Sequence, residues 1–255
     1  MNFHRWRLFG ALLVLTILAA ACQPISSAIT EVPEVVTSDL IPRDVLFGNP
    51  DKTSVRLSHD GARISYLAPV EGVLNVWVGP AGDPDAAQPV TNDSGRGIQI
   101  YGWAYTNEHL LYVQDKDGDE NWHLYSINLT TGETKDLTPI EGVQAAIKGV
   151  SPDSPMEVLV GLNNRVPQLH DLYVIDIDTG ERRLVLENEG FADFMVDDSY
   201  RVRFGLRITP DGGMALMEYG AAGTWQPFLT IDMQDVLTTR PITFDKSGQT
   251  LYMLD

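Results

Sequence analysis

The sequence predicts an all-β fold made of repeated units of short strands. One phrase, two strands joined by a tight turn, occurs at Trp122 to Pro139 (WHLYSINLTTGETKDLTP) and again at Leu172 to Leu186 (LYVIDIDTGERRLVL). In the first copy apolar residues alternate with more polar ones, and Thr131-Gly132 supplies the turn. A period of two and a glycine that tolerates positive φ are typical of a β-hairpin. Each copy therefore predicts a pair of antiparallel strands.

The copies are regularly spaced along the chain. Tyr125 of the first copy matches Tyr173 of the second, and Trp77 precedes Tyr125 by the same interval. A weaker copy, PFLTID with Leu229, follows Tyr173 after a somewhat longer interval. Repeats of about 40 to 50 residues that contain short strands and glycine turns are typical of the blades of a β-propeller.

A second phrase, a polar turn before an apolar strand, alternates with the first. Its copies are SHDGARISY at Ser58, TNEHLLY at Thr106, SPDSPMEVLV at Ser151, TPDGGMALM at Thr209 and FDKSGQTLY at Phe244. Five turns that interleave with four strand pairs predict about four blades and the start of a fifth. No long amphipathic helical pattern occurs beside them, which favours an all-β domain.

Residues 1–22 predict an export signal. Arg5 and Arg7 precede an apolar run from Leu8 to Ala21, which is shorter than the roughly 20 residues that span a bilayer as a helix. The stretch Ala19 to Cys22 (AAAC) resembles a bacterial lipobox, so we expect cleavage before Cys22 and lipidation of its thiol. This predicts an exported, lipid-anchored protein of the cell envelope, at the outer membrane if the cell has two membranes. An ordinary cleaved signal peptide or a buried thiol is the alternative.

Residues 23–42 have small, polar and proline positions without a period and predict a flexible tether, which leaves residues 43–255 for the propeller. Cys22 is the single cysteine, so no disulfide is expected in that domain. The formal net charge of −17 would repel nucleic acid and anionic lipid headgroups. We therefore expect no nucleic-acid partner and no membrane contact except through the lipid anchor.

Several segments together resemble a known family. They are LFGNP, RLSHDGARISYLAPVEGVLNVWV, DKDGDENWHLYSINLTTGETKDLTP, GLNNRVPQLHDLYVIDIDTGE and TPDGG, in that order. They are similar to the N-terminal β-propeller of the prolyl oligopeptidase family of serine peptidases, in its bacterial dipeptidyl aminopeptidase and acylaminoacyl peptidase branch. The resemblance covers roughly Ile41 to Asp255 and departs at His59, where the family usually has proline. It implies a seven- or eight-bladed propeller that caps an α/β-hydrolase domain and restricts entry to peptides.

This sequence stops at Asp255, before further blades and before any hydrolase domain, so we expect a truncated propeller. Blades taken from a larger ring keep the blade angle of that ring, so the first and last blades cannot meet. An open arc is therefore expected, with apolar faces exposed near Ile64 and Tyr66 at one end and near Leu251 and Tyr252 at the other. Such open edges favour self-association.

The sequence offers no residue for a catalytic role. The nucleophile elbow of an α/β-hydrolase, G-x-S-x-G, is absent from the sequence. Ser94 in NDSGRG is the nearest match, but it lacks the preceding glycine and is interpreted as a loop serine. His109, His123 and His170 lie beside or within strand phrases and are interpreted as hydrogen-bonded blade histidines rather than general bases.

Asp115, Asp117 and Asp119 have the alternate spacing with which a calcium loop begins. The match then fails, because Glu120 stands where the loop needs glycine and Ser126 stands where it needs glutamate. An acidic hairpin tip is the favoured interpretation, and a calcium site is the weak alternative.

A second polar group lies between two strand phrases. It consists of Asn163, Asn164 and Arg165 with His170 and Asp171. Hydrogen bonding in turns and between blades is the favoured role. The alternative is a substrate-facing loop in which Arg165 receives a carboxylate.

Two functions compete on these observations. The first is the non-catalytic, substrate-gating propeller portion of a membrane-tethered serine peptidase of the prolyl oligopeptidase type, with peptide substrates reached through a hydrolase domain absent from this chain. The alternative is a free-standing propeller lipoprotein that binds a protein or peptide. An enzyme with a metal or cofactor in the channel would need clustered histidine and carboxylate residues, which the sequence lacks, so no cofactor is expected.

Overall fold

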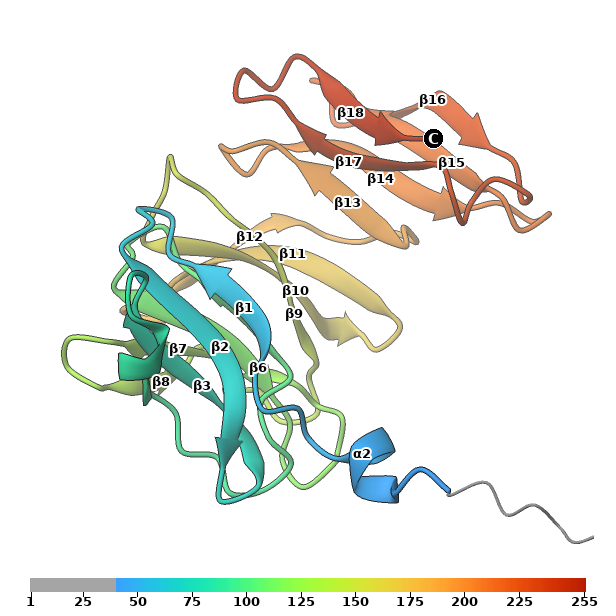
Figure 1. Ribbon diagram of the computed structural model, residues 1–255. Coiled ribbons are helices and arrows are strands. Elements are labelled where there is room, and N and C mark those ends of the chain that lie inside the picture. The colour runs from blue at the N-terminus through green and yellow to red at the C-terminus, as the bar shows by residue number, and fades with distance from the viewer. Residues whose placement is uncertain (1–39) are drawn as a thin grey trace, which may run out of the picture. The chain divides into compact units, whose positions relative to one another are not determined.

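The computed structural model describes residues 40–255 (Figure 1). The predicted signal peptide, the lipidation site Cys22 and most of the predicted tether lie outside these residues. The chain divides into two units after Leu46, and a short helix, α2 (Arg43–Phe47), ends one residue beyond this boundary. No helix within residues 40–255 combines the length and apolar character needed to cross a bilayer.

The second unit, Phe47–Asp255, consists of antiparallel sheets in chain order (Figure 1). Sheet 1 is formed by β1 (Thr53–Leu57), β2 (Arg63–Val70), β3 (Val73–Pro80) and β4 (Gln88–Pro89), with the 3-10 helix η1 (Pro84–Ala86) before β4. Sheet 2 is formed by β5 (Ile100–Trp103), β6 (His109–Gln114), β7 (His123–Asn128) and β8 (Thr134–Asp136). Sheet 3 is formed by β9 (Ala145–Val150), β10 (Glu157–Val166), β11 (Leu169–Asp176) and β12 (Arg182–Leu186).

The remaining strands continue the same plan. Sheet 4 is formed by β13 (Asp193–Val196), β14 (Val202–Ile208), β15 (Met214–Tyr219) and β16 (Trp225–Ile231). Sheet 5 is formed by β17 (Arg240–Phe244) and β18 (Leu251–Leu254). Within each sheet the strands pair in the order of the sequence, which is the up-and-down order of a propeller blade. The predicted four blades and start of a fifth are confirmed.

Apolar side chains fill the space between consecutive sheets. Leu67 and Val76 of sheet 1 share one buried cluster with Leu110 of sheet 2. A second cluster joins sheets 2 and 3, and a third joins sheets 3 and 4. Sheets 2 and 3 therefore bury one face against the sheet before and the other against the sheet after, and central strands such as β6 and β10 are buried along much of their length.

A repeated turn explains the regular spacing of the sequence. In every sheet the turn between the first two strands begins with a side-chain oxygen that accepts a backbone N–H, which favours a tight turn. The pairs are Arg63 N to Ser58 Oγ, His109 N to Thr106 Oγ1, Asp153 N to Ser151 Oγ, Arg201 N to Asp197 Oδ1 and Thr250 N to Asp245 Oδ1. These acceptors follow one another along the chain at nearly constant intervals.

The fourth phrase precedes an apolar strand, β15, as predicted, but it does not lie at the position equivalent to the other four turns. Thr209 lies between β14 and β15, the second and third strands of sheet 4, and Leu229 lies in the fourth strand, β16. Asp197 occupies the turn after the first strand instead. The phrase at Thr209 is an equally good match in sequence because it forms the same kind of turn: Asp211 accepts the N–H of Gly213.

Hydrogen bonds also join these turns from one sheet to the next. Arg63 Nη1 donates to the carbonyl oxygen of Asn107 at 2.6 Å. Arg203 Nη1 donates in the same way to the carbonyl oxygen of Gly248 at 2.7 Å, between sheets 4 and 5. Consecutive sheets are thus connected at their turns as well as through their apolar faces.

The described strands form an open arrangement, not a closed ring. β17 and β18 pair with each other, and sheet 5 contacts sheet 4 through the stacked rings of Phe204 and Phe244, 6.0 Å apart. Tyr252 in β18 is 55% exposed, as expected for an open end. The expectation for Tyr66 is wrong, because this residue is only 4% exposed and packs against Trp77 of β3 and against Ala87, while Ile64 and Leu251 are half-buried.

Candidate functional site

The first strands of three consecutive sheets surround one cavity. It has a volume of about 360 Å³ and is bounded by β1, β5 and β9. Its lining includes Arg56, His59, Ile100, Gly102, Ile147 and Lys148. A second cavity of about 320 Å³ continues along the first strands of sheets 3, 4 and 5 and shares Lys148 with the first. The first strands therefore form a continuous surface with space for a ligand, and we call the cavity at β1, β5 and β9 the first-strand cavity.

A β-bulge in β1 places Arg56 at this cavity. Thr53 pairs with Leu67 and Arg56 with Ser65, so β1 contains one residue more than the strand that it faces. Ser54 within the bulge has a φ of 53°, which is uncommon for a residue other than glycine. Bulges change the direction of the side chains that follow them and are frequent beside functional sites.

Two aromatic residues of β5 hold the bulge in place. The hydroxyl group of Tyr101 donates to the carbonyl oxygen of Ser54 at 2.7 Å. Trp103 Nε1 donates to Ser65 Oγ at 2.9 Å, and this serine oxygen lies 3.1 Å from the Tyr101 hydroxyl. Burial raises the pKa of Tyr101, so its hydroxyl group stays neutral and remains a donor. The bulge is consequently fixed by a buried network that joins sheets 1 and 2.

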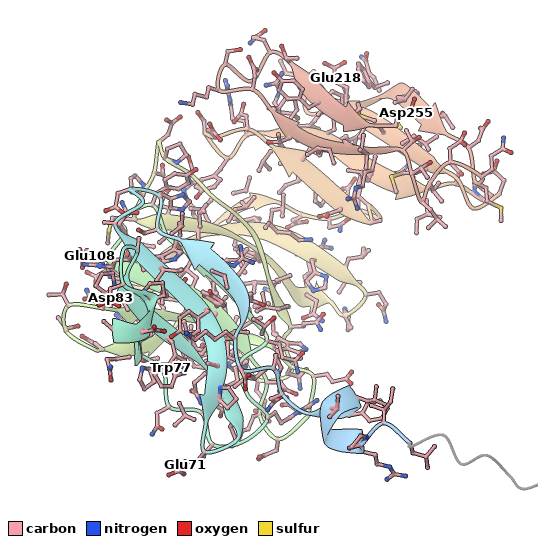
Figure 2. The ribbon with its side chains drawn as sticks, in the orientation of Figure 1. Glu71, Trp77, Asp83, Glu108, Glu218 and Asp255 are labelled. Carbon is pink, nitrogen blue, oxygen red and sulfur yellow. The ribbon has the colours of Figure 1, made fainter. Side chains whose placement is uncertain are left out.

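The cavity is lined by basic side chains and by no carboxylate. Figure 2 labels acidic residues of sheet 1, and Glu71 and Asp83 there are exposed to solvent away from this lining. Lys148 is already engaged, because its Nζ lies 2.8 Å from Asp193 Oδ1. A basic cavity is unusual for a chain with a net charge of −17, and it favours an anionic group as the ligand.

His59 contributes an aromatic wall. Its ring stacks on Tyr105 with the ring centroids 3.7 Å apart, and its Nε2 lies 3.3 Å from the carbonyl oxygen of Trp103. A carbonyl oxygen can only accept, so Nε2 carries the proton. The orientation of the ring is therefore set by sheet 2, although His59 belongs to the turn after β1.

The polar group predicted between two strand phrases lies in β10 and β11. Arg165 donates to both carboxylate oxygens of Asp171, with Nε–Oδ2 at 2.9 Å and Nη2–Oδ1 at 2.8 Å. Arg165 Nη2 also donates to the carbonyl oxygen of Asn188 at 2.8 Å, and the Asn188 N–H donates to Asp171 at 2.6 Å. This geometry supports the hydrogen-bonding interpretation, because the guanidinium of Arg165 is already paired.

The two asparagines of this group also form hydrogen bonds within the fold. Asn163 Oδ1 accepts the N–H of Gln144 at 2.6 Å, and Asn163 Nδ2 donates to the carbonyl oxygen of Pro167. Asn164 Nδ2 lies 3.2 Å from the hydroxyl oxygen of Tyr173. The structure thus joins these side chains to the loops beside sheet 3 and does not bring them to the first-strand cavity.

The three blade histidines differ from one another. His109 lies 3.1 Å from Thr106 Oγ1, and His123 Nδ1 lies 2.7 Å from Asp136 Oδ2, so both are hydrogen-bonded. His170 Nε2 is buried and has no hydrogen-bond partner, which differs from the expectation. Burial and the nearby charge of Lys148 lower the pKa of His170, so the ring is held in its neutral form.

The predicted calcium-like aspartates do not converge. Asp115 Oδ2 lies 2.8 Å from Arg96 Nη1, and Asp119 accepts the backbone N–H groups of Lys116 and Asn121. Asp117 is exposed. Within residues 40–255 no group of three or more histidine, cysteine, aspartate or glutamate side chains has a metal-binding arrangement. The geometry supports an acidic hairpin tip.

No motif in the sequence predicts Arg56, Tyr101 or Ser65 as site residues. These residues lie in three strands, and a bulge leaves no signature in the sequence of β1. The available signal was the repeat itself, since aligned repeats place β1, β5 and β9 at equivalent positions of their sheets. The basic lining could have been inferred from that alignment.

Comparisons with known proteins agree with this fold. No family model matches the sequence. The chain is 43% identical over 238 residues to dipeptidyl aminopeptidase BIII of Pseudoxanthomonas mexicana, a match that covers 93% of this chain and 34% of that relative. The chain spans about a third of the length of the curated relatives that it matches.

Solved structures show the same fold at low sequence identity. The β-propeller domain of the Trilobed protease from Pyrococcus furiosus, described as having an open velcro topology, is similar with a TM-score of 0.52 at 17% identity, over 80% of this chain and 67% of that one. Prolyl oligopeptidase B from Galerina marginata is similar with a TM-score of 0.55 at 15% identity, over 79% of this chain and 29% of that one. The 43% identity to the dipeptidyl aminopeptidase confirms the resemblance inferred from the sequence, and the chain is similar to the β-propellers of the prolyl oligopeptidase family of serine peptidases.

Proposed function

We propose that this propeller gates the access of peptides in a serine peptidase of the prolyl oligopeptidase type, whose reacting serine lies outside these 255 residues. The observation that carries the proposal is the 43% identity to a dipeptidyl aminopeptidase of which this chain matches 34%. The geometry supports it. The first-strand cavity, of about 360 Å³, lies within the range of about 300–1,000 Å³ that is usual for small-molecule sites.

The cavity is suited to selecting peptides by size. Its walls are backbone segments of three sheets, and these sheets are joined by buried apolar clusters, so the walls cannot separate without loss of core packing. A single extended peptide segment meets little resistance from such a surface, whereas a folded protein meets much more. The propeller therefore gates access by admitting extended peptides more readily than folded proteins.

The chain alone is expected to be inactive. It contains no G-x-S-x-G, so it has no serine activated by a strained turn. We expect no labelling by a fluorophosphonate probe and no hydrolysis of dipeptidyl chromogenic substrates above background. Stoichiometric labelling of any serine would contradict the proposal.

A chimera tests the gating role. Residues 43–255 replace the aligned segment of the Pseudoxanthomonas mexicana relative, and we expect the chimera to hydrolyse dipeptidyl substrates. Gly102 has open space around it and lines the cavity, so Gly102→Trp should narrow the cavity and lower kcat/KM by about tenfold or more, with fluorophosphonate labelling unchanged. Gly82 also has open space but lies outside the cavity lining, and Gly82→Trp is the matched control.

Two outcomes of this experiment would count against the proposal. In the first, the chimera folds and labels with fluorophosphonate but does not hydrolyse peptides. In the second, Gly102→Trp and Gly82→Trp have equal kcat/KM values. Either result would favour the free-standing binding module.

We further propose that the protein is tethered to a membrane through Cys22. The proposal rests on the sequence alone, on the apolar run and the AAAC stretch that ends at Cys22. The expressed protein should partition into detergent and incorporate a fatty-acid analogue, and Cys22→Ser should move it to the aqueous phase. One acyl chain binds a membrane weakly, so firm partitioning indicates more than one chain. Incorporation that survives the substitution would exclude Cys22 as the site.

A further inference from the structure

We propose that the first-strand cavity recognises a peptide carboxylate through Arg56, beside apolar side chains of the same peptide. This inference deepens the proposed function and rests on it, because it specifies the chemistry of the peptide that the propeller admits. The structure carries it on three observations. They are the state of the Arg56 charge, the network that fixes its position and the character of the cavity walls.

Arg56 is the basic group of the cavity that is free to bind. Its guanidinium lies over the ring of Tyr101, 5.5 Å from the ring centroid, and within residues 40–255 it forms no ion pair with a carboxylate. Lys148 is neutralised by Asp193, and His59 Nε2 donates to a carbonyl oxygen. The cavity therefore has one unpaired positive charge, which corresponds to one carboxylate on the ligand.

The backbone that carries Arg56 is held in place before a ligand arrives. The bulge beside it includes Ser54 at a φ of 53°, and this conformation is held by the hydrogen bond from the Tyr101 hydroxyl to the Ser54 carbonyl oxygen. The same tyrosine ring lies under the exposed guanidinium, so one buried side chain holds the bulge and contacts the arginine. An arginine that already contacts an aromatic ring loses less conformational freedom when it forms a bidentate pair with a carboxylate.

The walls next to Arg56 select against other anions. Leu57 is 58% exposed and Ile100 is 56% exposed, and both line the cavity. Apolar side chains of a ligand gain free energy when they are buried against such a surface, whereas free phosphate has no apolar surface to bury. Polyanions such as nucleic acids are repelled by the net charge of −17. A peptide with a carboxylate beside a large apolar residue can pair with the charge of Arg56 and also pack against the apolar walls.

Calorimetric titration of the full chain tests the inference without a hydrolase domain. The probes are N-acetyl-Leu-Phe with a free carboxylate, N-acetyl-Leu-Phe-amide and N-acetyl-Glu-Phe-amide, which distinguish a terminal from a side-chain carboxylate. We expect at least one carboxylate probe to bind about tenfold or more tightly than N-acetyl-Leu-Phe-amide. Arg56→Gln should remove this difference, and Arg183→Gln, which removes an exposed arginine of β12, should preserve it.

Tyr101→Phe provides a second variant that retains the ring beneath Arg56. It removes the contacts of the hydroxyl group with the Ser54 carbonyl oxygen and with Ser65 Oγ, so we expect a partial loss of the carboxylate preference, about threefold. The inference is overturned if the amide probe binds as tightly as the carboxylate probes, if no probe binds, or if Arg56→Gln retains the preference. Binding is measured in the absence of hydrolysis. If the carboxylate probes bind more tightly than the amide probe but the chimera is inactive, the gating role is rejected and the carboxylate site is retained.

Discussion

Replacing Asp171 by alanine is expected to lower the free energy of unfolding by about 3 kcal/mol. Its side chain is buried and accepts two hydrogen bonds from Arg165 and one from the backbone of Asn188. The substitution leaves the arginine with one acceptor and the Asn188 N–H with none. The expected loss is at the lower end of the range for buried pairs, because the Arg165 side chain is 37% exposed and water partly replaces the carboxylate.

Urea unfolding followed by circular dichroism measures this loss. The control is Arg183→Ala, which removes the pair between Arg183 Nη2 and Glu157 Oε2 at 3.5 Å, an exposed ion pair expected to contribute no more than about 1 kcal/mol. Equal losses for Asp171→Ala and Arg183→Ala would show that burial of the carboxylate does not govern its contribution.

The same carboxylate should make stability depend on pH. Burial by itself raises the pKa of Asp171, but the hydrogen bonds from Arg165 and Asn188 outweigh it, and the pKa is lowered overall. The stability that Asp171 contributes is therefore complete above its unfolded pKa of about 3.9 and is lost as the pH falls through the lower pKa of the folded chain. Asp171→Ala should flatten the pH dependence of stability in this acidic range.

The second large effect concerns the core between sheets 2 and 3. Leu162 in β10 is completely buried and belongs to the same cluster as Leu111 and Leu124 of sheet 2. Leu162→Ala removes apolar contacts with both sheets and leaves a cavity, so we expect it to lower the free energy of unfolding by about 3 kcal/mol. Leu184→Ala on β12, where the leucine is 48% exposed, should cost about 0.5 kcal/mol or less.

Hydrogen exchange shows whether the two sheets depend on one another. Leu162→Ala should reduce the protection of amides in β6 and β7 as well as in β10, because the shared core connects them. Loss of protection confined to sheet 3 would mean that the sheets fold as independent units.

The fold was predictable because the same turn recurs at nearly constant spacing. Ser58, Thr106 and Ser151 identify the first turn of three sheets, since a side-chain oxygen must accept a backbone N–H at that position. The fourth sheet was assigned from Thr209, although Asp197 occupies the equivalent position. Serine, threonine and aspartate serve this role in any tight hairpin, so the composition of a turn does not tell which two strands it joins. The spacing along the chain distinguishes the two candidate turns, because Asp197 continues the nearly constant interval of the earlier turns and Thr209 does not.

The candidate site was less accessible from the sequence. The group from Asn163 to Asp171 is conspicuous because its polar residues are close in sequence, and the structure places them in a partly buried hydrogen-bond network. Arg56 is inconspicuous, a single arginine between Val55 and Leu57. Its importance follows from a bulge and from a tyrosine of the next sheet, and neither feature is encoded locally. Sites that are assembled from several sheets are therefore found from the spatial alignment of repeats rather than from motifs.

Photo-cross-linking tests most directly whether peptides bind at the first strands. The full chain is irradiated with N-acetyl-Leu-benzoylphenylalanine that carries a free carboxylate, and the cross-linked residues are identified by mass spectrometry. Our account predicts cross-links in β1, β5 and β9, which are suppressed by excess N-acetyl-Leu-Phe and reduced by Arg56→Gln. Cross-links concentrated in the fourth strands, β4, β8 and β12, or unaffected by Arg56→Gln, would contradict it.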